Sequence, residues 1–449
     1  MHASLTTSRT PRPLLRTWVA AAVLALCGTS GAQAQSLSEL FVAARDHDAN
    51  YLSAVANAKA TSAKGDQALA GVLPQVNFSA DKFKTDNNVD TSQPTRDSDS
   101  QTLSIKQPLF QVGNFLGVEQ GAHTRDIANR QRQAAEQDLV IRMTQAYFDV
   151  LSASDSVTVV QAQKQAVTEQ LAAAKRNFEV GTSTITDSRE AQARFDLVVA
   201  QEIAAQNDLR VKRLALEQLV GINDVQPKAL KVPVALPDLS TMDLDFWLSQ
   251  AKANNAQLQQ AQSAQKIASL ESKKAMSNHL PTLDLVAQQR RTYGFSGTTA
   301  AGSYGRTDNS SIGLQFNLPL FVGFAHQNRI RETLHLQDKA QADLDNAQRG
   351  VVQATRSAFF GVQAGMSQVK ALEAAEASSQ VSLDANKLGY QVGVRINIDV
   401  LNAQTQLYQT KRDLSQARYN VLLGQLRLKQ ASGKLTGQDL QAINDLLAP

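Results

Sequence analysis

Two short stretches that resemble each other carry side chains suited to binding ions. They read NFEVGTSTITDSRE at 177–190 and GYQVGVRINIDVLN at 389–402. Asp187 in the first stretch matches Asp399 in the second at a spacing of 212 residues, and the glycines of the two stretches share that spacing. A carboxylate beside a turn can cap a helix, pair with a basic side chain or attract dissolved cations. These aspartates are therefore the first candidates for a functional site.

Catalytic constellations are not apparent elsewhere. The five histidines after residue 34 are scattered without metal-ligand spacing. The cluster Asp46-His47-Asp48 matches Ala253-Asn254-Asn255 in the second half of the chain, which favours a solvated helix face over a site. The sequence contains no glycine-rich phosphate loop and no serine-nucleophile motif. We expect no enzyme activity, no cofactor and no metal site.

The first 34 residues have the pattern of a secretory signal peptide. Arginines precede an apolar segment from Trp18 to Cys27, and Ala32-Gln33-Ala34 gives a cleavage motif before Gln35. The apolar segment is too short to cross a membrane. A lipid anchor at Cys27 is the competing interpretation, but Leu26 stands where a small residue is expected.

Without that segment the chain is close to neutral. It carries three of the 45 basic residues and none of the 41 acidic ones, which leaves 42 basic against 41 acidic residues. Binding to nucleic acid therefore has no electrostatic support. No cysteine remains for disulfides or thiol chemistry. No later apolar run reaches 18 residues, so a membrane location would require β-strands.

A tandem duplication organises the rest of the chain. Leu73-Pro74 matches Leu280-Pro281 at a spacing of 207 residues, and Pro108-Leu109-Phe110 matches Pro319-Leu320-Phe321 at 211. Offsets that drift so little indicate two copies with small loop insertions. The predicted domains are a signal peptide at 1–34, a first repeat at 35–226, a linker at 227–242, a second repeat at 243–435 and a C-terminal segment at 436–449.

Each repeat contains two segments in which apolar and polar residues alternate. Ile312, Leu314 and Phe316 alternate with polar residues or glycine, and shorter versions occur around 76–81, 103–106 and 283–285. This period of two is typical of transmembrane barrel strands. A soluble sheet with one solvated face gives the same pattern. Long polar loops at 84–100 and 294–310 suit the outer side of a barrel.

Two proline-free arms, 109–226 and 320–448, are predicted to be pairs of long helices. A helix from Phe115 to Val180 would be about 100 Å long. Such a helix, poor in large apolar residues, must pack against copies of itself. Four strands also cannot close a barrel, since the smallest need about eight. Both considerations predict oligomerisation, and three copies would supply twelve strands and twelve long helices.

These features resemble the TolC family of outer-membrane efflux proteins. The likeness is carried by AYFDVL at 146–151, LPTLDL at 280–285, VVQATRSAF at 351–359, GYQVGVRINIDVLNA at 389–403 and ARYNVLLGQLRLKQASG at 417–433. The resemblance implies an α+β membrane protein, a trimer with a 12-stranded β-barrel of four strands per chain. The barrel would continue into a long α-helical coiled-coil barrel that crosses the periplasm and closes at its far tip.

The resemblance places both aspartate-containing turns at that tip. It implies a latch in which Tyr390 bonds Asp187 across the two helical pairs and Arg395 reaches Thr186 or Asp187. Without the resemblance, Tyr390 can be a half-buried packing residue and Arg395 a solvated charge. Gly181 and Gly393 would end the outgoing helices in the left-handed conformation, and would form the turns where an adaptor docks.

The resemblance also implies that Asp399 lines the pore, so that three carboxylates would surround the axis and favour cations. Family members commonly carry a second acidic residue one turn later, where this chain has Asn402. That departure halves the expected charge. The residues alone allow a simpler interpretation, in which Thr186, Asp187, Asn397 and Asp399 cap the returning helices.

The predicted function is an exit duct of a tripartite efflux pump or type I secretion system, gated at its periplasmic tip. The predicted location is the outer membrane, with a periplasmic extension. Expected partners are two further copies, outer-membrane lipid, a periplasmic adaptor and an inner-membrane transporter of ABC, RND or MFS type, with no nucleic acid. The alternative is a soluble periplasmic coiled-coil scaffold or adaptor, which would have no need of paired alternating strands.

Overall fold

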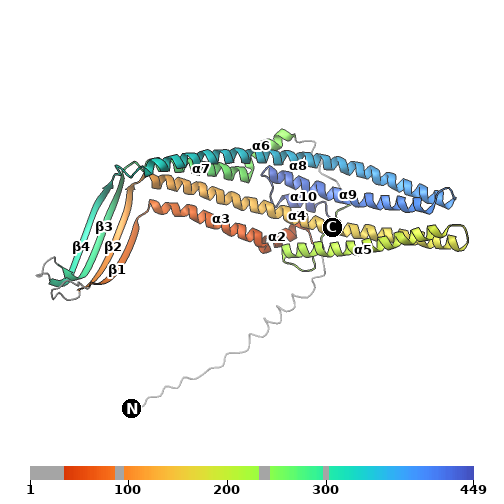
Figure 1. Ribbon diagram of the computed structural model, residues 1–449, viewed down its shortest axis with the longest axis horizontal. Helices are drawn as coiled ribbons and strands as arrows, with labels where there is room; N and C mark the ends of the chain where they lie inside the picture. The colour runs from red at the N-terminus through yellow and green to blue at the C-terminus, as the bar shows by residue number, and fades with distance from the viewer. Residues whose placement is uncertain (1–34, 86–95, 232–242, 297–302, 449) are drawn as a thin grey trace, which may run out of the picture.

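The computed structural model describes residues 35–85, 96–231, 243–296 and 303–448. The predicted signal peptide lies outside these residues, as do most of the predicted linker and the central parts of the two long loops. The described part forms an elongated body with a sheet at one end and two helical turns at the other (Figure 1). No helix in the described ranges is both long and apolar enough to cross a membrane.

Helices and strands follow one another in the same order in both halves. The first half contains α2 (Leu37–His47), α3 (Ala49–Gln67), η1 (Ala68–Gly71), β1 (Gln75–Thr85), β2 (Arg96–Phe110), α4 (Val112–Glu179) and α5 (Ile185–Val220). The second contains α6 (Leu244–Asn254), α7 (Ala256–Ser277), β3 (Thr282–Ser296), β4 (Ser303–Asn317), α8 (Ala325–Gln391) and α9 (Asn397–Ala431), followed by α10 (Asp439–Asn444). The predicted combination of a four-stranded sheet and long helical pairs is confirmed. The domain boundaries themselves stay a prediction.

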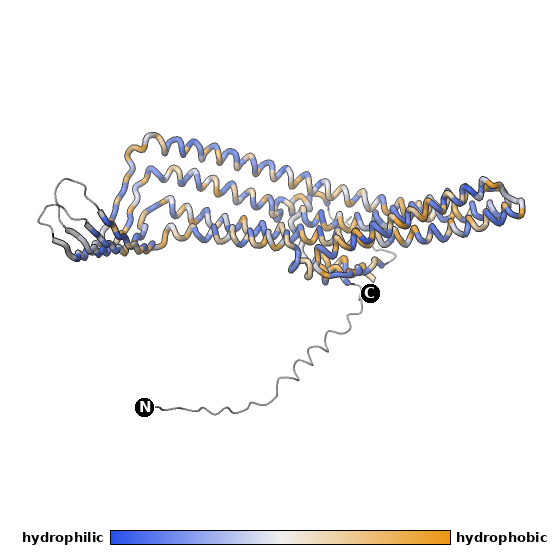
Figure 2. The backbone as a smooth tube through the Cα atoms, turned by 60° about the horizontal axis from the view of Figure 1, so that its bottom comes forward, coloured by the Kyte–Doolittle hydropathy of each residue, from blue (hydrophilic) through white to orange (hydrophobic). Residues whose placement is uncertain are grey.

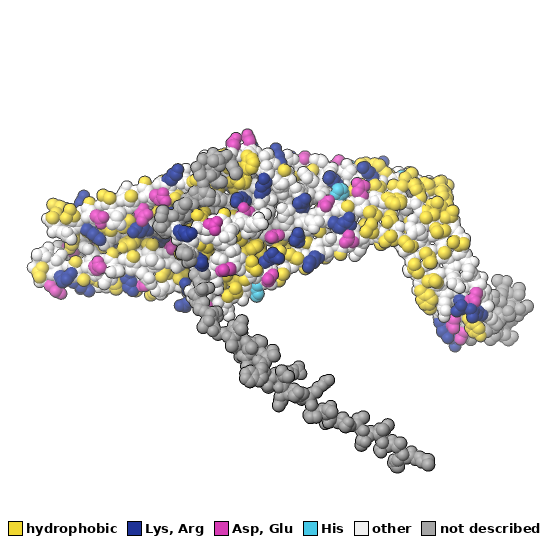
Figure 3. All heavy atoms as spheres, turned by 180° about the vertical axis from the view of Figure 1, so that it is seen from behind, with side chains coloured by type: hydrophobic (Ala, Val, Ile, Leu, Met, Phe, Trp, Pro, Cys, Tyr) yellow, Lys and Arg dark blue, Asp and Glu magenta, His cyan; other side chains and the backbone are white. Residues whose placement is uncertain are grey.

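The four strands form one antiparallel sheet in the order β1-β2-β3-β4. Their alternation is in phase, because Val76 pairs with Ile105, Ile105 with Ala287, and Ala287 with Ile312. One face is therefore apolar and the other polar. The apolar face is uncovered in the single chain: Ile312 is 77% exposed, and hydrophobic side chains cover the surface there (Figure 3).

The main core lies near the middle of the long helices, where α2, α5, α9 and α10 pack around α4. Orange segments gather in the same region in Figure 2. The predicted seam of Val140, Met143, Tyr147 and Val150 is fully buried here. The Tyr147 hydroxyl donates to the Lys228 carbonyl at 2.9 Å. This core joins the two repeats about halfway between the sheet and the turns.

Asp48 corrects the expectation that its cluster is a solvated helix face. Its side chain is buried and accepts from the Tyr51 N–H at 2.7 Å, as the N-cap of α3. Arg142 donates two hydrogen bonds to it, at 2.9 and 3.0 Å, and these lower the pKa of the Asp48 carboxyl. Asn255 caps α7 at the matching position. A polar residue kept in both repeats was the available signal for a cap.

Candidate functional site

Both long helical pairs turn at the end opposite the sheet (Figure 1). Gly181 and Gly393 follow α4 and α8 with φ of 77° and 83°, a left-handed conformation that glycine adopts without steric cost. The turns share their hydrogen bonds. The N–H of Gly181 donates to the carbonyl of Phe178 at 3.0 Å, and that of Gly393 to the carbonyl of Tyr390 at 3.2 Å. The two turns are thus geometrically equivalent.

The first residues of the returning helices differ. Thr184 caps α5 and forms a capping box with Asp187, whose Oδ2 accepts from the Thr184 N–H at 3.0 Å while its own N–H donates to Thr184 Oγ1 at 3.2 Å. Thr186 is exposed and makes no side-chain hydrogen bond among the described residues. The residue at the start of α9 is Ile396, which provides no side-chain cap.

Asn397, the first residue of α9, does not cap that helix as expected. Its side chain is 1% exposed and joins the two helical pairs. Its Oδ1 accepts from Gln170 Nε2 of α4, and its Nδ2 donates to the Asp187 carbonyl of α5 at 3.3 Å. One buried amide therefore links three helices from two repeats.

The proposed latch residues have partners other than those implied by the family resemblance. The Tyr390 hydroxyl accepts from Asn177 Nδ2 at 3.1 Å rather than bonding Asp187. The bond still joins the two helical pairs, since Asn177 belongs to α4. Arg395 Nη1 lies 3.7 Å from Asp399 Oδ2, four residues along its own chain, rather than reaching Thr186 or Asp187.

Gly389 allows the Arg395 side chain to fold back in this way. A Cβ added to Gly389 would lie 2.7 Å from Arg395 Cγ, closer than two such atoms can approach. The guanidinium is thereby directed toward the first turn of α9, where Asp399 lies. The spacing of four residues between Arg395 and Asp399 was a sequence signal for this pair.

The two candidate pore residues have different surroundings. The Asp399 side chain is 33% exposed and has Arg395 as its ion-pair partner. Asn402 accepts from Arg194 Nη2 of α5 at 2.9 Å, which adds a third bond between the two helical pairs. The pore-lining role of both residues remains a prediction.

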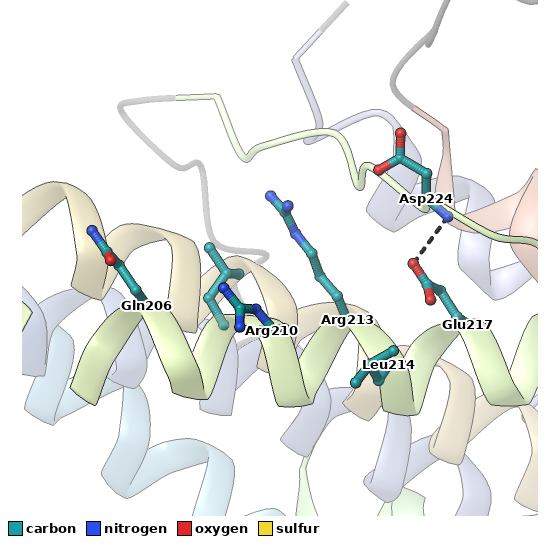
Figure 4. A pocket seen from close by; sticks show the side chains of 7 residues that line it. Gln206, Arg210, Arg213, Leu214, Glu217 and Asp224 are labelled. Carbon is teal, nitrogen blue, oxygen red and sulfur yellow. Dashed lines mark hydrogen bonds between the residues drawn. The ribbon is translucent and has the colours of Figure 1, made fainter. Parts of the chain in front are cut away.

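Few other places in the described chain could bind a small molecule. A cavity of about 410 Å³ lies along the C-terminal half of α5, lined by Arg210, Arg213 and Glu217 among others. Its Glu217 carboxylate accepts from the Asp224 N–H at 2.9 Å (Figure 4). It contains no nucleophile–base pair. Across the described ranges no three metal-ligating side chains come together.

A family of known proteins matches both halves of the chain. The model of the family described as outer membrane efflux protein matches residues 40–222 and 247–434. Outer membrane protein TolC of Escherichia coli is 33% identical over 95% of this chain and 88% of its own length. The alkaline protease secretion protein AprF of Pseudomonas aeruginosa is 29% identical over 96% of this chain and 90% of its own.

Solved structures show the same fold at lower identity. The outer membrane protein VceC of Vibrio cholerae has a TM-score of 0.75 at 19% identity, over 88% of this chain and 96% of its own. The CmeC outer membrane channel of Campylobacter jejuni has a TM-score of 0.75 at 15% identity, over 92% of this chain and 90% of its own. The chain therefore belongs to the outer membrane efflux protein family, and it is an outer-membrane exit duct rather than an enzyme.

Proposed function

We propose that three copies of this chain form a duct for efflux or type I secretion, and that contacts between the helical turns hold it closed. The sheet supports the trimer, because β1 and β4 each have a strand partner on one side only in the described chain. Open strand edges are costly in lipid. Three copies would join β4 of one to β1 of the next and close twelve strands into a barrel.

The sorted faces of the sheet favour this duct over the soluble scaffold. A soluble sheet of this kind covers its apolar face with other parts of the protein. Here Val76, Phe78, Ile312 and Leu314 all remain exposed. The names of relatives such as AprF and the proteases secretion protein PrtF of Dickeya chrysanthemi support a secretion role beside efflux.

Docking of a periplasmic adaptor at the turns is part of the proposal. Both turns present uncovered apolar side chains, including Val180, Val392 and Val394. Gly181 and Gly393 themselves face open space. Apolar surface of this kind is a common feature of protein interfaces. The adaptor would couple the duct to an inner-membrane transporter of ABC, RND or MFS type.

The observation that carries the closed tip is the buried Asn397 amide. Opening the tip requires α8 and α9 to move relative to α4 and α5. That movement must break the bonds of Asn397 to Gln170 and Asp187, together with the Asn177–Tyr390 and Arg194–Asn402 bonds. Buried polar groups that lose their partners cost about 1–3 kcal/mol each. We therefore place the main closing contact at Asn397, with Tyr390 as a second.

Asp399 would act on ions rather than on closure. In a trimer three Asp399 carboxylates would face one axis, each beside its own Arg395. The arginine offsets part of the charge, and Asn402 adds none. We therefore expect a weak preference for cations at the tip.

Single-channel conductance of the purified protein in planar bilayers tests the closing contact. We expect Asn397→Leu to raise the conductance several-fold, because both partners of the amide lose their bond. Tyr390→Phe with Arg395→Ser should produce a smaller rise. Asn386→Leu is the control, since Asn386 bonds only within α8. An unchanged conductance in Asn397→Leu, in a variant that still migrates as a trimer, would contradict the proposal.

A further inference from the structure

The outward face of the sheet changes character toward the end that carries the long loops. Near the helices it is apolar, with Leu285 opposite Leu314 and Ala287 opposite Ile312. Two strand positions further on, the same face carries Arg291 opposite Asp308, and then Tyr293 opposite Arg306. Arg290, next to Arg291, points to the polar inner face because side chains alternate.

Three of these charged residues form a compact group. Arg291 Nε donates to Asp308 Oδ1 at 3.0 Å. Arg306 donates to Asp308 Oδ2 through Nε at 3.0 Å and Nη2 at 2.6 Å. One carboxylate thus holds two guanidinium groups and leaves one positive charge in excess. Asp308 uses only Nε of Arg291, which leaves the two terminal nitrogens of that half-exposed side chain for another acceptor.

Other charges on this part of the face compensate one another. Lys82 Nζ lies 3.7 Å from Asp99 Oδ1, and Lys84 is paired with Asp97 in the strand register. The excess positive charge therefore belongs to the group of Arg291, Asp308 and Arg306.

A cavity of about 150 Å³ lies beside this group. Its walls are Phe78, Gln101, Leu103, Gln289 and Arg291. All five residues belong to the outward face by the strand register. Two of them are apolar, two are amides and one is a cation. Such a lining matches a ligand that has an apolar part on one side and an anionic, hydrogen-bonding part on the other.

The depth of the group fits the level of lipid headgroups. A lipid-facing arginine costs about 2–4 kcal/mol at the bilayer midplane and about 0–1 near the interface. From Leu320, which is 89% exposed at the base of the sheet, to Asp308 the chain can extend roughly 40 Å. At a strand tilt of about 45° this is about 28 Å of depth, close to the thickness of a hydrocarbon core.

We propose that Arg291 and Arg306, held by Asp308, bind the phosphate of an anionic glycolipid headgroup in the outer leaflet, with an acyl chain lying along Phe78 and Leu103. Guanidinium groups bind phosphate through paired, charge-assisted hydrogen bonds. Asp308 fixes both arginines before the lipid arrives, which lowers the entropy cost of binding. The site rests on the placement of the barrel in the outer membrane, but not on how the tip is closed.

The test measures lipid binding to the purified, detergent-solubilised trimer by native mass spectrometry. The probes are bis-phosphorylated lipid A, dephosphorylated lipid A and inorganic phosphate. We expect the phosphorylated lipid to bind the wild-type protein, and Arg291→Gln to weaken that binding about tenfold or more, as loss of a charge-assisted bond predicts. Arg306→Gln should weaken it less, because the cavity is lined by Arg291.

Arg290→Gln is the matched control, because it removes the same charge one residue away on the opposite face. Equal losses in Arg290→Gln and Arg291→Gln would overturn the proposal in favour of general charge attraction. Equal binding of the dephosphorylated lipid would overturn the phosphate contact, and binding of inorganic phosphate with the same affinity would overturn the lipid. Arg291→Gln should conduct like the wild type in planar bilayers, so loss of this site and failure of the duct are distinguishable.

Discussion

Asp187 and Asp399 occupy equivalent positions in the two repeats, yet their carboxylates make different contacts. Asp187 completes a capping box with Thr184. At the position of Thr184 the second repeat has Ile396, which cannot accept a hydrogen bond. The carboxylate of Asp399 therefore pairs with Arg395 and remains partly exposed. A single hydroxyl decides whether the same aspartate stabilises its helix or is left for ions.

The two hairpins also depend on each other unequally. The α4–α5 hairpin caps its own returning helix. The α8–α9 hairpin begins its returning helix with Asn397, whose side chain bonds only to residues of the other hairpin. At the equivalent position the first repeat has Ile185, which is half exposed. The first hairpin thus serves as the fixed support, and the second is the one that can be released.

The largest effect that tests this asymmetry is expected at the start of α9. Asn397→Ile should lower the free energy of opening of the first turn of α9 by about 2–3 kcal/mol, because Gln170 and the Asp187 carbonyl lose a buried partner. Hydrogen exchange of the purified trimer measures this opening. The matched change Ile185→Asn should stay within about 0.5 kcal/mol, as exposed substitutions usually do. Similar losses in both variants would remove the distinction between support and released hairpin.

Exchanging the cap residues should give an intermediate effect. Thr184→Ile should destabilise the start of α5 by about 1 kcal/mol through loss of its cap. Ile396→Thr should stabilise α9 by up to about 1 kcal/mol and draw Asp399 into a capping box. Exchange rates of the first-turn amides report both changes. If Ile396→Thr leaves the α9 amides unprotected, the missing hydroxyl is not what separates the two aspartates.

Removing each carboxylate should have a smaller effect on stability but a selective one on ions. Asp399→Asn breaks an exposed ion pair worth about 0–1 kcal/mol and should abolish whatever block divalent cations cause. Asp187→Asn removes a negative charge at a helix N-terminus, worth about 0.3–1 kcal/mol, and should leave the block intact. Current recorded during a divalent-cation titration separates them. Block that persists in Asp399→Asn would identify that residue as structural.

The smallest expected effect concerns pH, and it contrasts the tip with a second contact between α4 and α9. There the Tyr419 hydroxyl donates to Asp155 Oδ2 at 2.8 Å. Burial raises the pKa of the Asp155 carboxyl, although the Tyr419 bond acts in the opposite direction. The folded protein therefore binds this proton more tightly than the unfolded chain. The contribution of Asp155 to stability is complete below its ordinary pKa and is lost as pH rises through the folded pKa.

Thermal unfolding over a pH series from about 4 to 8 measures this dependence. Asp155→Asn should remove the corresponding part of the pH dependence. The neutral amide contacts of Asn397 should show none. A pH dependence that survives in Asp155→Asn would assign it to another group.

Much of the fold could be predicted because it depends on local periodicity. Alternation in segments such as 311–318 predicted the strands, and the absence of proline after Pro108 and Pro319 predicted the long helices. The glycines of the turns were predictable for the same reason, since Gly181 and Gly393 end repeated helices. These features depend on neighbours along the chain.

The contacts at the tip depend on the relative position of hairpins more than 200 residues apart, and these were less predictable. Asn397 was expected to cap its own helix, because local sequence does not show that Gln170 and Asp187 lie beside it. The partner of Arg395 was available from its spacing to Asp399, but the family resemblance pointed elsewhere. Asp48 was underestimated because its partner Arg142 is 94 residues away.

The open edges of the four-stranded sheet have a genetic consequence. Since β1 of one copy must pair with β4 of another, every pore is a joint product of three polypeptides. If a cell makes equal amounts of wild-type and variant chains that assemble at random, roughly one pore in eight contains wild-type chains alone. An allele that changes Asn397 and leaks should therefore be dominant, with a phenotype visible beside an intact copy of the gene.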